Sequence, residues 1–316
     1  MPNRKGSIGI SYPGSKQFNA PIYLNNILNI VPHISTFVDV MAGGAGITAE
    51  ALKRPEIDHV VYNDADYDIY SLVNFLLDND IPGDWYDWVS KKDFIRLLNC
   101  DSSPKRTAQL LCYSFGSNRK SYAFSEPAEQ LKKMGHEYVL GITGGKALSR
   151  ETGVSFPKLN TGSIPERRTQ YRHIISGKIK DSQAEPDFRD QQNMERLKHL
   201  QELERLERMQ RLHQFERLQQ PRLSLFNRDY LDFSPHSGVV FVDPPYANTN
   251  QKGYQSCIDY DQLYSWFRSL KVPAFMCEYE APFECIWEKE VSQYSSRGSQ
   301  RKGSRRIEKM FWNGIS

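Results

Sequence analysis

The residues with the clearest chemical potential are Asp243, Pro244, Pro245 and Tyr246, which directly follow the apolar run at 238–242. Two consecutive prolines cannot continue a central β-strand, so a strand should end at this point. Proline also fixes the backbone, so that a carbonyl points outward as an acceptor between a carboxylate and an aromatic ring. This arrangement suits a planar base that carries an amino group.

Such an amino nitrogen is a poor nucleophile, because its lone pair is delocalised into the ring. If Asp243 and the Pro244 carbonyl accept its two hydrogens, the lone pair can be directed at a sulfonium methyl group. A base inside a duplex must be flipped out, and stacking on Tyr246 would offset part of the lost base stacking. We therefore predict direct in-line methylation of an exocyclic amino group, without a metal or a covalent enzyme intermediate.

A glycine-rich turn indicates where a cofactor would bind. The run TFVDV at 36–40 reads as a strand, residues 41–46 (MAGGAG) as a turn, and 47–52 as the start of a helix. Glycine lets the backbone approach a ligand closely at the carboxyl end of a parallel strand. We predict cofactor contacts at Asp39, Met41 and Gly43.

Asp64 strengthens this interpretation. It follows the strand predicted at 59–62 and lies about 20 residues beyond the glycines, where an acid can accept hydrogen bonds from ribose hydroxyls. The phosphate-binding pattern G-x-x-x-x-G-K-[ST] does not occur. The adenosine part should therefore belong to a cofactor without phosphates.

These motifs require a parallel sheet to position them. Strand–helix units at 36–52 and 59–77, followed by strands at 238–242 and 273–277 with a helix at 261–270, predict an α/β, Rossmann-like sheet with crossover helices. We assign residues 1–100 and 222–316 to a methyltransferase catalytic domain. Residues 101–221 lack a βαβ rhythm, and we assign them to an inserted, largely helical and loop-containing DNA-recognition domain.

Within that insertion, apolar residues recur at every third position over about 190–220, a repeat that an α-helix of 3.6 residues per turn spreads around its axis. The pattern is not a regular coiled coil. It fits a low-complexity helical spacer or a helix that binds a partner.

Composition restricts the class of protein. The net charge is only +3, but residues 297–306 (RGSQRKGSRR) carry five positive charges and no acid, which fits a phosphate-contacting segment or a solvated loop. The five cysteines never form C-x-x-C, so we predict neither a disulfide framework nor a metal site. No run of 18 apolar residues and no signal peptide is recognisable, and we expect a cytoplasmic protein without membrane contact.

Together these blocks resemble the Dam-type, or D12 class, adenine-N6 DNA methyltransferases of the alpha group. Residues 12–16 (YPGSK), the glycine turn, residues 63–64 and the DPPY motif occur in the family's order, with a target-recognition region before DPPY. The resemblance implies a bacterial or phage-encoded enzyme that uses S-adenosyl-L-methionine to methylate adenine N6 in double-stranded DNA. One departure is that the family's F-x-G-x-G is here Met41-x-Gly43-x-Ala45.

The resemblance also implies roles for residues that the motifs alone do not assign. Tyr12 and Lys16 match family positions that contact the cofactor or the target base, and Asp229 matches the acid that reads the cofactor adenine. Residues 114–118 (SFGSN) resemble the loop that opens the family's DNA-binding region. The residues expected to contact DNA are Ser114, Asn118, Arg119, Lys120, Arg301, Lys302, Arg305 and Arg306.

Several alternatives stay open. The same geometry would serve cytosine-N4 methylation, and a catalytically silent DNA-binding relative would keep the fold. Cytosine carbon-5 chemistry is disfavoured, because it needs a cysteine after a proline and no such pair occurs. The sequence leaves open the recognition site, the oligomeric state and whether a separate restriction endonuclease accompanies the protein.

Overall fold

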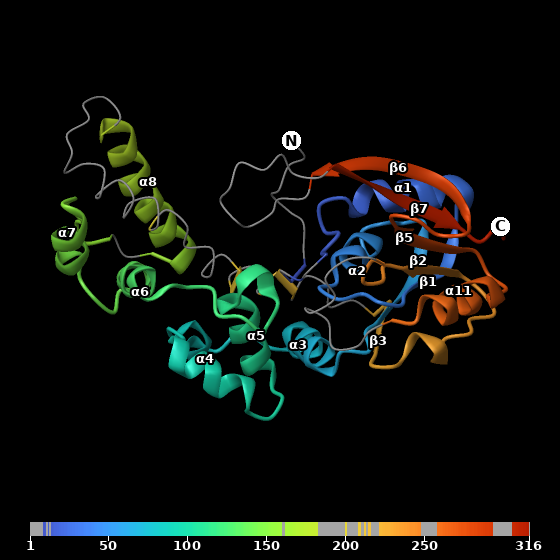
Figure 1. The fold of residues 1–316 in the computed structure, drawn as a ribbon, viewed down its shortest axis with the longest axis horizontal. Helices are drawn as coiled ribbons and strands as arrows, with labels where there is room; N and C mark the ends of the chain where they lie inside the picture. Colours follow the sequence, from blue (N-terminus) through green and yellow to red (C-terminus); the bar gives the residue numbers. More distant parts are fainter. Residues whose placement is uncertain are drawn as a thin grey trace.

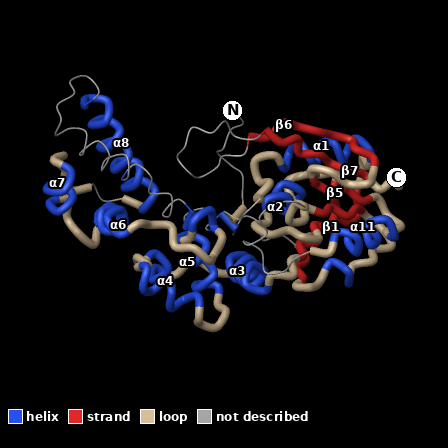
Figure 2. The backbone as a smooth tube through the Cα atoms, in the orientation of Figure 1, coloured by secondary structure: helices blue, strands red, loops and turns tan. Residues whose placement is uncertain are grey.

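The architecture comes from a computed structural model, which describes residues 9–10, 12, 14–159, 162–182, 200, 208–209, 212, 214–215, 221–247, 258–292 and 305–315. The described chain forms two lobes, one built around a β-sheet and the other from helices (Figure 1). The tube drawing shows the same division, with the strands confined to one lobe (Figure 2).

Seven strands form one sheet in the order β3-β2-β1-β4-β5-β7-β6. They are β1 (Ile34–Asp39), β2 (Ile57–Asn63), β3 (Leu223–Phe226), β4 (Val239–Val242), β5 (Ala274–Glu278), β6 (Glu284–Ser292) and β7 (Arg305–Trp312). The first five strands pair in parallel, whereas β7 lies antiparallel between β5 and β6. The predicted α/β fold with a parallel Rossmann-like sheet is confirmed.

Helices cover both faces of this sheet. The sheet lobe contains α1 (Ala20–Ile30), α2 (Gly46–Ala51), α3 (Tyr67–Asp78) and α11 (Tyr260–Ser269). Successive side chains of a strand point to opposite faces, so Phe37 packs with α1–α3 whereas Val38 packs with α11. The central strands β4 and β5 are buried at every position, as expected for strands covered on both faces.

The region between β2 and β3 is helical where it is described. It contains α4 (Lys91–Leu98), α5 (Pro104–Tyr113), α6 (Glu126–Leu140), α7 (Lys146–Thr152) and α8 (Ile164–Ser182), with short 3-10 turns at Gly83–Tyr86 and Phe115–Ser117. The chain returns to the sheet at β3, which pairs with β2. A further 3-10 turn, Tyr230–Asp232, follows β3.

The leucine-repeat segment contributes to the protein's own core. Leu200, Met209, Leu212 and Phe215 are the described members of the repeat, and each is at most 3% exposed within the main core cluster. For these four residues the spacer and the partner-binding interpretations are both wrong, because their apolar surface is already covered by this chain. The rest of the repeat lies outside the described residues.

Candidate active site

Four carboxyl groups lie at one edge of the sheet. Asp39 ends β1 and Glu278 ends β5, whereas Asp64 and Asp243 directly follow β2 and β4. These four strands are parallel neighbours in the order β2-β1-β4-β5, so their carboxyl ends coincide. Ligands of open α/β sheets bind outside this edge, and the structure places the predicted cofactor and catalytic motifs there together.

Asp39 fixes the glycine turn to the helix that follows it. Its Oδ2 accepts hydrogen bonds from the backbone N–H of Thr48 at 3.0 Å and from the Thr48 hydroxyl at 2.7 Å. The residue is 1% exposed, and burial raises the pKa of Asp39 to about 7 although the Thr48 hydrogen bonds oppose the shift. This carboxyl group therefore positions α2 and the turn from inside the protein.

The glycine turn closes on Asp64. Gly43 has a left-handed φ of +48°, and its N–H donates to Asp64 Oδ2 at 2.7 Å. Asp64 Oδ1 accepts the N–H of Asp66 at 2.8 Å. Burial raises the pKa of Asp64 to about 6, although these two N–H groups oppose the shift. Since each carboxylate oxygen keeps a second lone pair, Asp64 can still accept hydroxyl hydrogens of a ribose.

The N-terminal segment packs directly on this turn. The N–H of Ile10 donates to the carbonyl of Gly44 at 2.8 Å. A Cβ atom at Gly44 would lie 2.5 Å from the Ile10 carbonyl oxygen, and one at Gly43 would lie 3.0 Å from the Tyr12 ring. The glycines of the turn thus make room for the N-terminal segment, and this packing brings Tyr12 beside the cofactor turn.

Lys16 connects the N-terminal segment to the DPPY motif. Its Nζ lies 2.9 Å from Asp243 Oδ1 and 3.4 Å from Glu308 Oε1. The same ammonium group lies 4.6 Å from the centroid of the Tyr246 ring. Burial works against its charge, but the carboxylates of Asp243 and Glu308 outweigh burial and raise the pKa of Lys16. Lys16 therefore stays charged beside the catalytic motif.

Asp243 presents an unused acceptor. The 2.9 Å contact of Oδ1 with Lys16 is an ion pair whose angles do not make a hydrogen bond, and this buried oxygen has no hydrogen-bond partner among the described residues. Burial raises the pKa of Asp243 to about 6, with Lys16 opposing the shift. At neutral pH the group is therefore mainly a carboxylate that can accept one more hydrogen bond.

Glu308 on β7 holds the aromatic residue of the motif. Its Oε1 accepts a hydrogen bond from the Tyr246 hydroxyl at 2.6 Å, and its Oε2 accepts one from the Tyr23 hydroxyl at 2.7 Å. The Tyr246 ring also meets the Tyr279 ring edge to face, with centroids 4.7 Å apart. The ring of Tyr246 is consequently fixed in orientation by contacts at its hydroxyl group and its edge.

Glu278 supports the backbone that leaves the motif. Its Oε1 accepts the N–H of Ala247 at 3.0 Å, whereas its Oε2 is buried without a hydrogen-bond partner among the described residues. Burial raises the pKa of Glu278 to about 8. The Tyr260 hydroxyl donates to the carbonyl of Pro245 on the same stretch. The motif is thus held at both of its ends.

Two other predicted cofactor residues lie at this edge with fewer contacts. Asp229 follows β3 and is exposed, and its Oδ1 accepts the N–H of Leu231 at 3.0 Å. Met41 is partly buried against the core cluster on the α11 face of the sheet. Neither arrangement conflicts with a cofactor contact, and both roles stay predictions.

The predicted DNA-contacting residues are placed unevenly. Ser114 and Arg119 are buried, Asn118 is partly buried and Lys120 is exposed. Arg306 is partly buried, with its guanidinium 4.9 Å from the centroid of the Tyr279 ring. Arg301, Lys302 and the side chain of Arg305 lie outside the described residues. The basic tail therefore leads directly to the strand that carries Glu308.

Within the described ranges, no group of three or more His, Cys, Asp or Glu side chains could hold a metal ion. The described helices include none that is both long and apolar enough to cross a membrane. Cys100, Cys112, Cys277 and Cys285 are free thiols, and Cys257 lies outside the described residues.

Comparison with protein families decides between the chemistries that this site would allow. Residues 12–133 match the model of the D12 class N6 adenine-specific DNA methyltransferases. The chain belongs to this family. The methyltransferase therefore acts on the N6 amino group of adenine in DNA, which excludes cytosine as its main target. A search of curated proteins finds no match. The matched segment includes Lys16 and Asp64, whereas Asp243 lies beyond it.

Sequence reasoning missed three residues that shape the site. Glu308 was noted only as a landmark behind the basic tail, although it joins Lys16, Tyr23 and Tyr246. Glu278 ends a strand that had been predicted to stop one residue earlier. An acid inside an apolar strand, such as Glu278 after the run AFMC, was the signal that could have identified it.

Proposed function

We propose that the methyltransferase uses S-adenosyl-L-methionine as methyl donor and holds it between the glycine turn and Asp64. The bound donor supplies an electrophilic methyl group on a positively charged sulfur. A buried acid with free lone pairs at Asp64, a left-handed glycine at Gly43 and the adjacent ring of Tyr12 fit a nucleoside without phosphates. Asp229, at the same sheet edge, is the proposed contact for the adenine of the donor.

The observation that carries the proposal is the unused oxygen of Asp243. A buried carboxylate oxygen without a donor is costly unless a ligand completes it, and an amino N–H of the target adenine would do so. The Pro244 carbonyl would accept the second N–H. With both hydrogens held, the nitrogen lone pair is free to face the methyl group. The product nitrogen carries one extra proton, which Asp243 accepts and then releases to water.

Lys16 and Tyr246 complete the binding of the base. The ring of Tyr246 is held by Glu308 and is available to stack on a flipped adenine. The ammonium of Lys16 balances the charge of Asp243, which favours the ionised, hydrogen-bond-accepting form. The exposed part of the 114–120 loop and the basic tail are the proposed contacts to duplex DNA.

The test is incubation with methyl-labelled donor and mixed-sequence duplex DNA, followed by digestion to nucleosides and mass spectrometry. We expect N6-methyldeoxyadenosine from the unaltered protein. Asp243→Ala should abolish transfer while donor binding, measured by calorimetry, changes little, because Asp243 lies at the base and not at the ribose. Asp58→Ala, which alters an exposed aspartate, is the matched control. Full activity of Asp243→Ala would contradict the mechanism, and N4-methylcytosine as the main product would contradict the substrate.

A further inference from the structure

A tightly folded loop follows α5, and we define it as the anchored loop, residues 114–122. Ser114 and Tyr122 form an isolated antiparallel bridge, and the N–H of Phe115 donates to the carbonyl of Ser121 at 2.8 Å. Asn118 Oδ1 accepts the N–H groups of Lys120 and Ser121, each at 2.9 Å. The loop therefore has one defined conformation, with Phe115 48% exposed on its surface.

The anchored loop is also strained. Ser117 and Arg119 have φ values of +58° and +57°, a left-handed conformation that residues with a side chain rarely adopt. Such a conformation persists only where the surroundings enforce it, and it concentrates at functional sites. The N–H of Arg119 donates to Ser114 Oγ at 2.9 Å, which closes the strained part of the loop.

A buried ion pair ties this loop to the cofactor side of the protein. The guanidinium of Arg119 donates from Nη1 to Asp66 Oδ1 at 3.2 Å and from Nη2 to Asp66 Oδ2. Arg119 and Asp66 are only 8% and 7% exposed. Nη1 also lies 3.5 Å from Asp68. The side chain of Arg119 therefore points into the protein and is engaged there.

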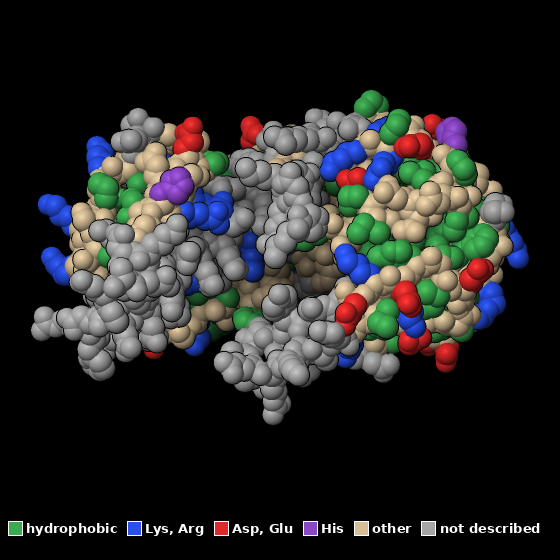
Figure 3. Space-filling model, turned by 90° about the horizontal axis from the view of Figure 1, so that it is seen from above, with side chains coloured by type: hydrophobic (Ala, Val, Ile, Leu, Met, Phe, Trp, Pro, Cys, Tyr) green, Lys and Arg blue, Asp and Glu red, His purple; other side chains and the backbone are tan. Residues whose placement is uncertain are grey.

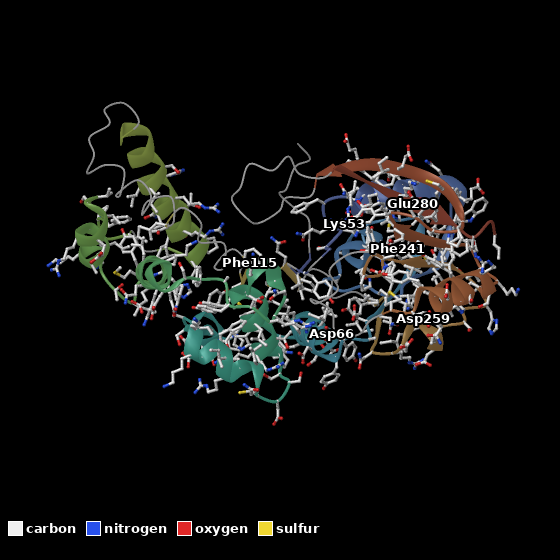
Figure 4. All side chains as sticks on the ribbon, viewed as in Figure 1. Lys53, Asp66, Phe115, Phe241, Asp259 and Glu280 are labelled. Carbon is white, nitrogen blue, oxygen red and sulfur yellow. The ribbon has the colours of Figure 1, made fainter. Side chains whose placement is uncertain are left out.

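Asp66 is itself part of the turn that forms the proposed ribose site. Its N–H donates to Asp64 Oδ1 at 2.8 Å, and its side chain caps α3 by accepting the N–H groups of Asp68 and Ile69. Asp64 in turn holds Gly43. A continuous chain of hydrogen bonds thus runs from the glycine turn through Asp64 and Asp66 to Arg119. In Figure 4, Asp66 and Phe115 lie in the middle of the molecule, near the starts of α3 and the loop.

The leucine-repeat segment braces the same loop from its other side. Arg208 Nη1 donates to the carbonyls of Leu111, Cys112 and Ser114 at 3.4–3.5 Å, which satisfies the carboxyl end of α5 where the loop begins. Viewed from above, the protein shows a recess between the two lobes with Lys and Arg side chains on both sides (Figure 3). The anchored loop stands where α5 meets the sheet lobe.

We propose that Arg119 is a positioning residue that couples the two ligands of the methyltransferase. Through Asp66 it fixes the anchored loop relative to the ribose acid Asp64, so that donor binding favours the loop conformation that contacts DNA, and DNA binding favours the donor site. The inference rests on the proposed function, because it takes Asp64 as a donor ligand and the loop as a DNA contact. It replaces the expectation that Arg119 itself binds phosphate.

The experiment measures the affinity for S-adenosylhomocysteine, the demethylated form of the donor, with and without a saturating duplex that the protein methylates. By linkage, the ratio of the two dissociation constants is the coupling factor, which is typically 5–150 in coupled systems. We expect at least about tenfold tightening in the unaltered protein. The factor should fall to near one in Asp66→Asn, where asparagine keeps the helix cap but removes the charge facing Arg119. Arg119→Ala should behave in the same way.

Arg106→Ala is the matched control, because Arg106 pairs with Asp68 at 2.9 Å but does not anchor the loop. It should keep the coupling factor. Circular dichroism and thermal unfolding establish that each variant folds, and Asp66→Asn carries the test if Arg119→Ala does not.

The outcomes separate the inference from the proposed function. A coupling factor near one in the unaltered protein, or an unchanged factor in both Asp66→Asn and Arg119→Ala, overturns the role of Arg119. If Arg119→Ala instead lowers the salt dependence of DNA binding by about one ion while the coupling is kept, Arg119 is a phosphate contact. Failure of the unaltered protein to bind S-adenosylhomocysteine at all would refute the proposed donor site itself.

Discussion

Two tyrosine hydroxyls that share one carboxylate allow the role of Glu308 to be tested with a built-in control. Tyr246→Phe removes the hydroxyl that donates to Oε1 at 2.6 Å, and Tyr23→Phe removes the one that donates to Oε2 at 2.7 Å. Each change deletes one oxygen atom and leaves the aromatic ring. Only Tyr246 belongs to the DPPY motif, so the two variants differ mainly in their distance from the target base.

The expected magnitudes follow from these contacts. A hydrogen bond to a charged, buried acceptor contributes about 1.5–3 kcal/mol, so both variants should lose stability by a similar amount within that range. If the hydroxyl of Tyr246 holds its ring for stacking, part of this free energy also reaches the transition state. The value of kcat/KM for Tyr246→Phe should then fall about ten- to a hundredfold, because 1.4 kcal/mol corresponds to a factor of ten. Tyr23→Phe should change kcat/KM by less than about threefold.

The assay is single-turnover methylation of adenine-unmethylated duplex DNA, combined with urea unfolding of the same proteins. Glu308→Gln should lower the rate, and its combination with Tyr246→Phe should cost less than the sum of the two changes, because both remove the same contact. Equal rate losses in Tyr23→Phe and Tyr246→Phe would show that the carboxylate acts only through stability. Strictly additive effects of the Glu308 and Tyr246 changes would refute the positioning argument.

Three other predictions concern the same protein. Protonation of Asp243, whose pKa is raised to about 6, converts its acceptor into a donor, so the methylation rate should fall tenfold per pH unit below that value, and a rate that stays level one unit lower would contradict the assignment. Gly44→Ala should lower the unfolding free energy by about 1–3 kcal/mol and weaken donor binding, since its Cβ would meet the Ile10 carbonyl at 2.5 Å; unchanged thermal unfolding would disprove this packing. Neutralising the basic tail should weaken binding to all duplexes and reduce its salt slope, as measured by salt titration, and an unchanged slope would remove the tail from the DNA interface. The four tail residues are Arg301, Lys302, Arg305 and Arg306.

The sequence predicted those parts of the fold in which local pattern and burial agree. The runs before Asp39, Asp64 and Asp243 are continuous and apolar, and they became β1, β2 and β4 in a parallel sheet. Strand β3 was missed because its four residues are only half buried at the sheet edge. The antiparallel pair β6 and β7 was missed because charged residues alternate through both strands, which hides their apolar face.

Contacts between distant segments could not be predicted in the same way. Lys16, Asp243 and Glu308 lie in three separate parts of the chain, and only the parallel order of the sheet followed by the antiparallel return of β7 brings them together. A motif states which residue types are present but not which of their atoms stay free. The sequence suggested Arg119 as a DNA contact because it lies among polar residues in a loop, whereas in the fold its charge is already balanced by Asp66.

The charge balance at the DPPY motif explains why an N-terminal lysine, a mid-chain aspartate and a C-terminal glutamate belong to one site. Two carboxylates this close to each other, both shielded from water, would repel and favour protonation, which would destroy the acceptor that Asp243 must provide. The ammonium of Lys16 lies within 2.9 Å of one and 3.4 Å of the other, so it stabilises both in their charged forms. Glu308 can then bind the Tyr246 hydroxyl as a carboxylate while Asp243 keeps one oxygen free for the adenine amino group. The catalytic motif is therefore competent only when the first and last segments of the described chain are folded against the sheet.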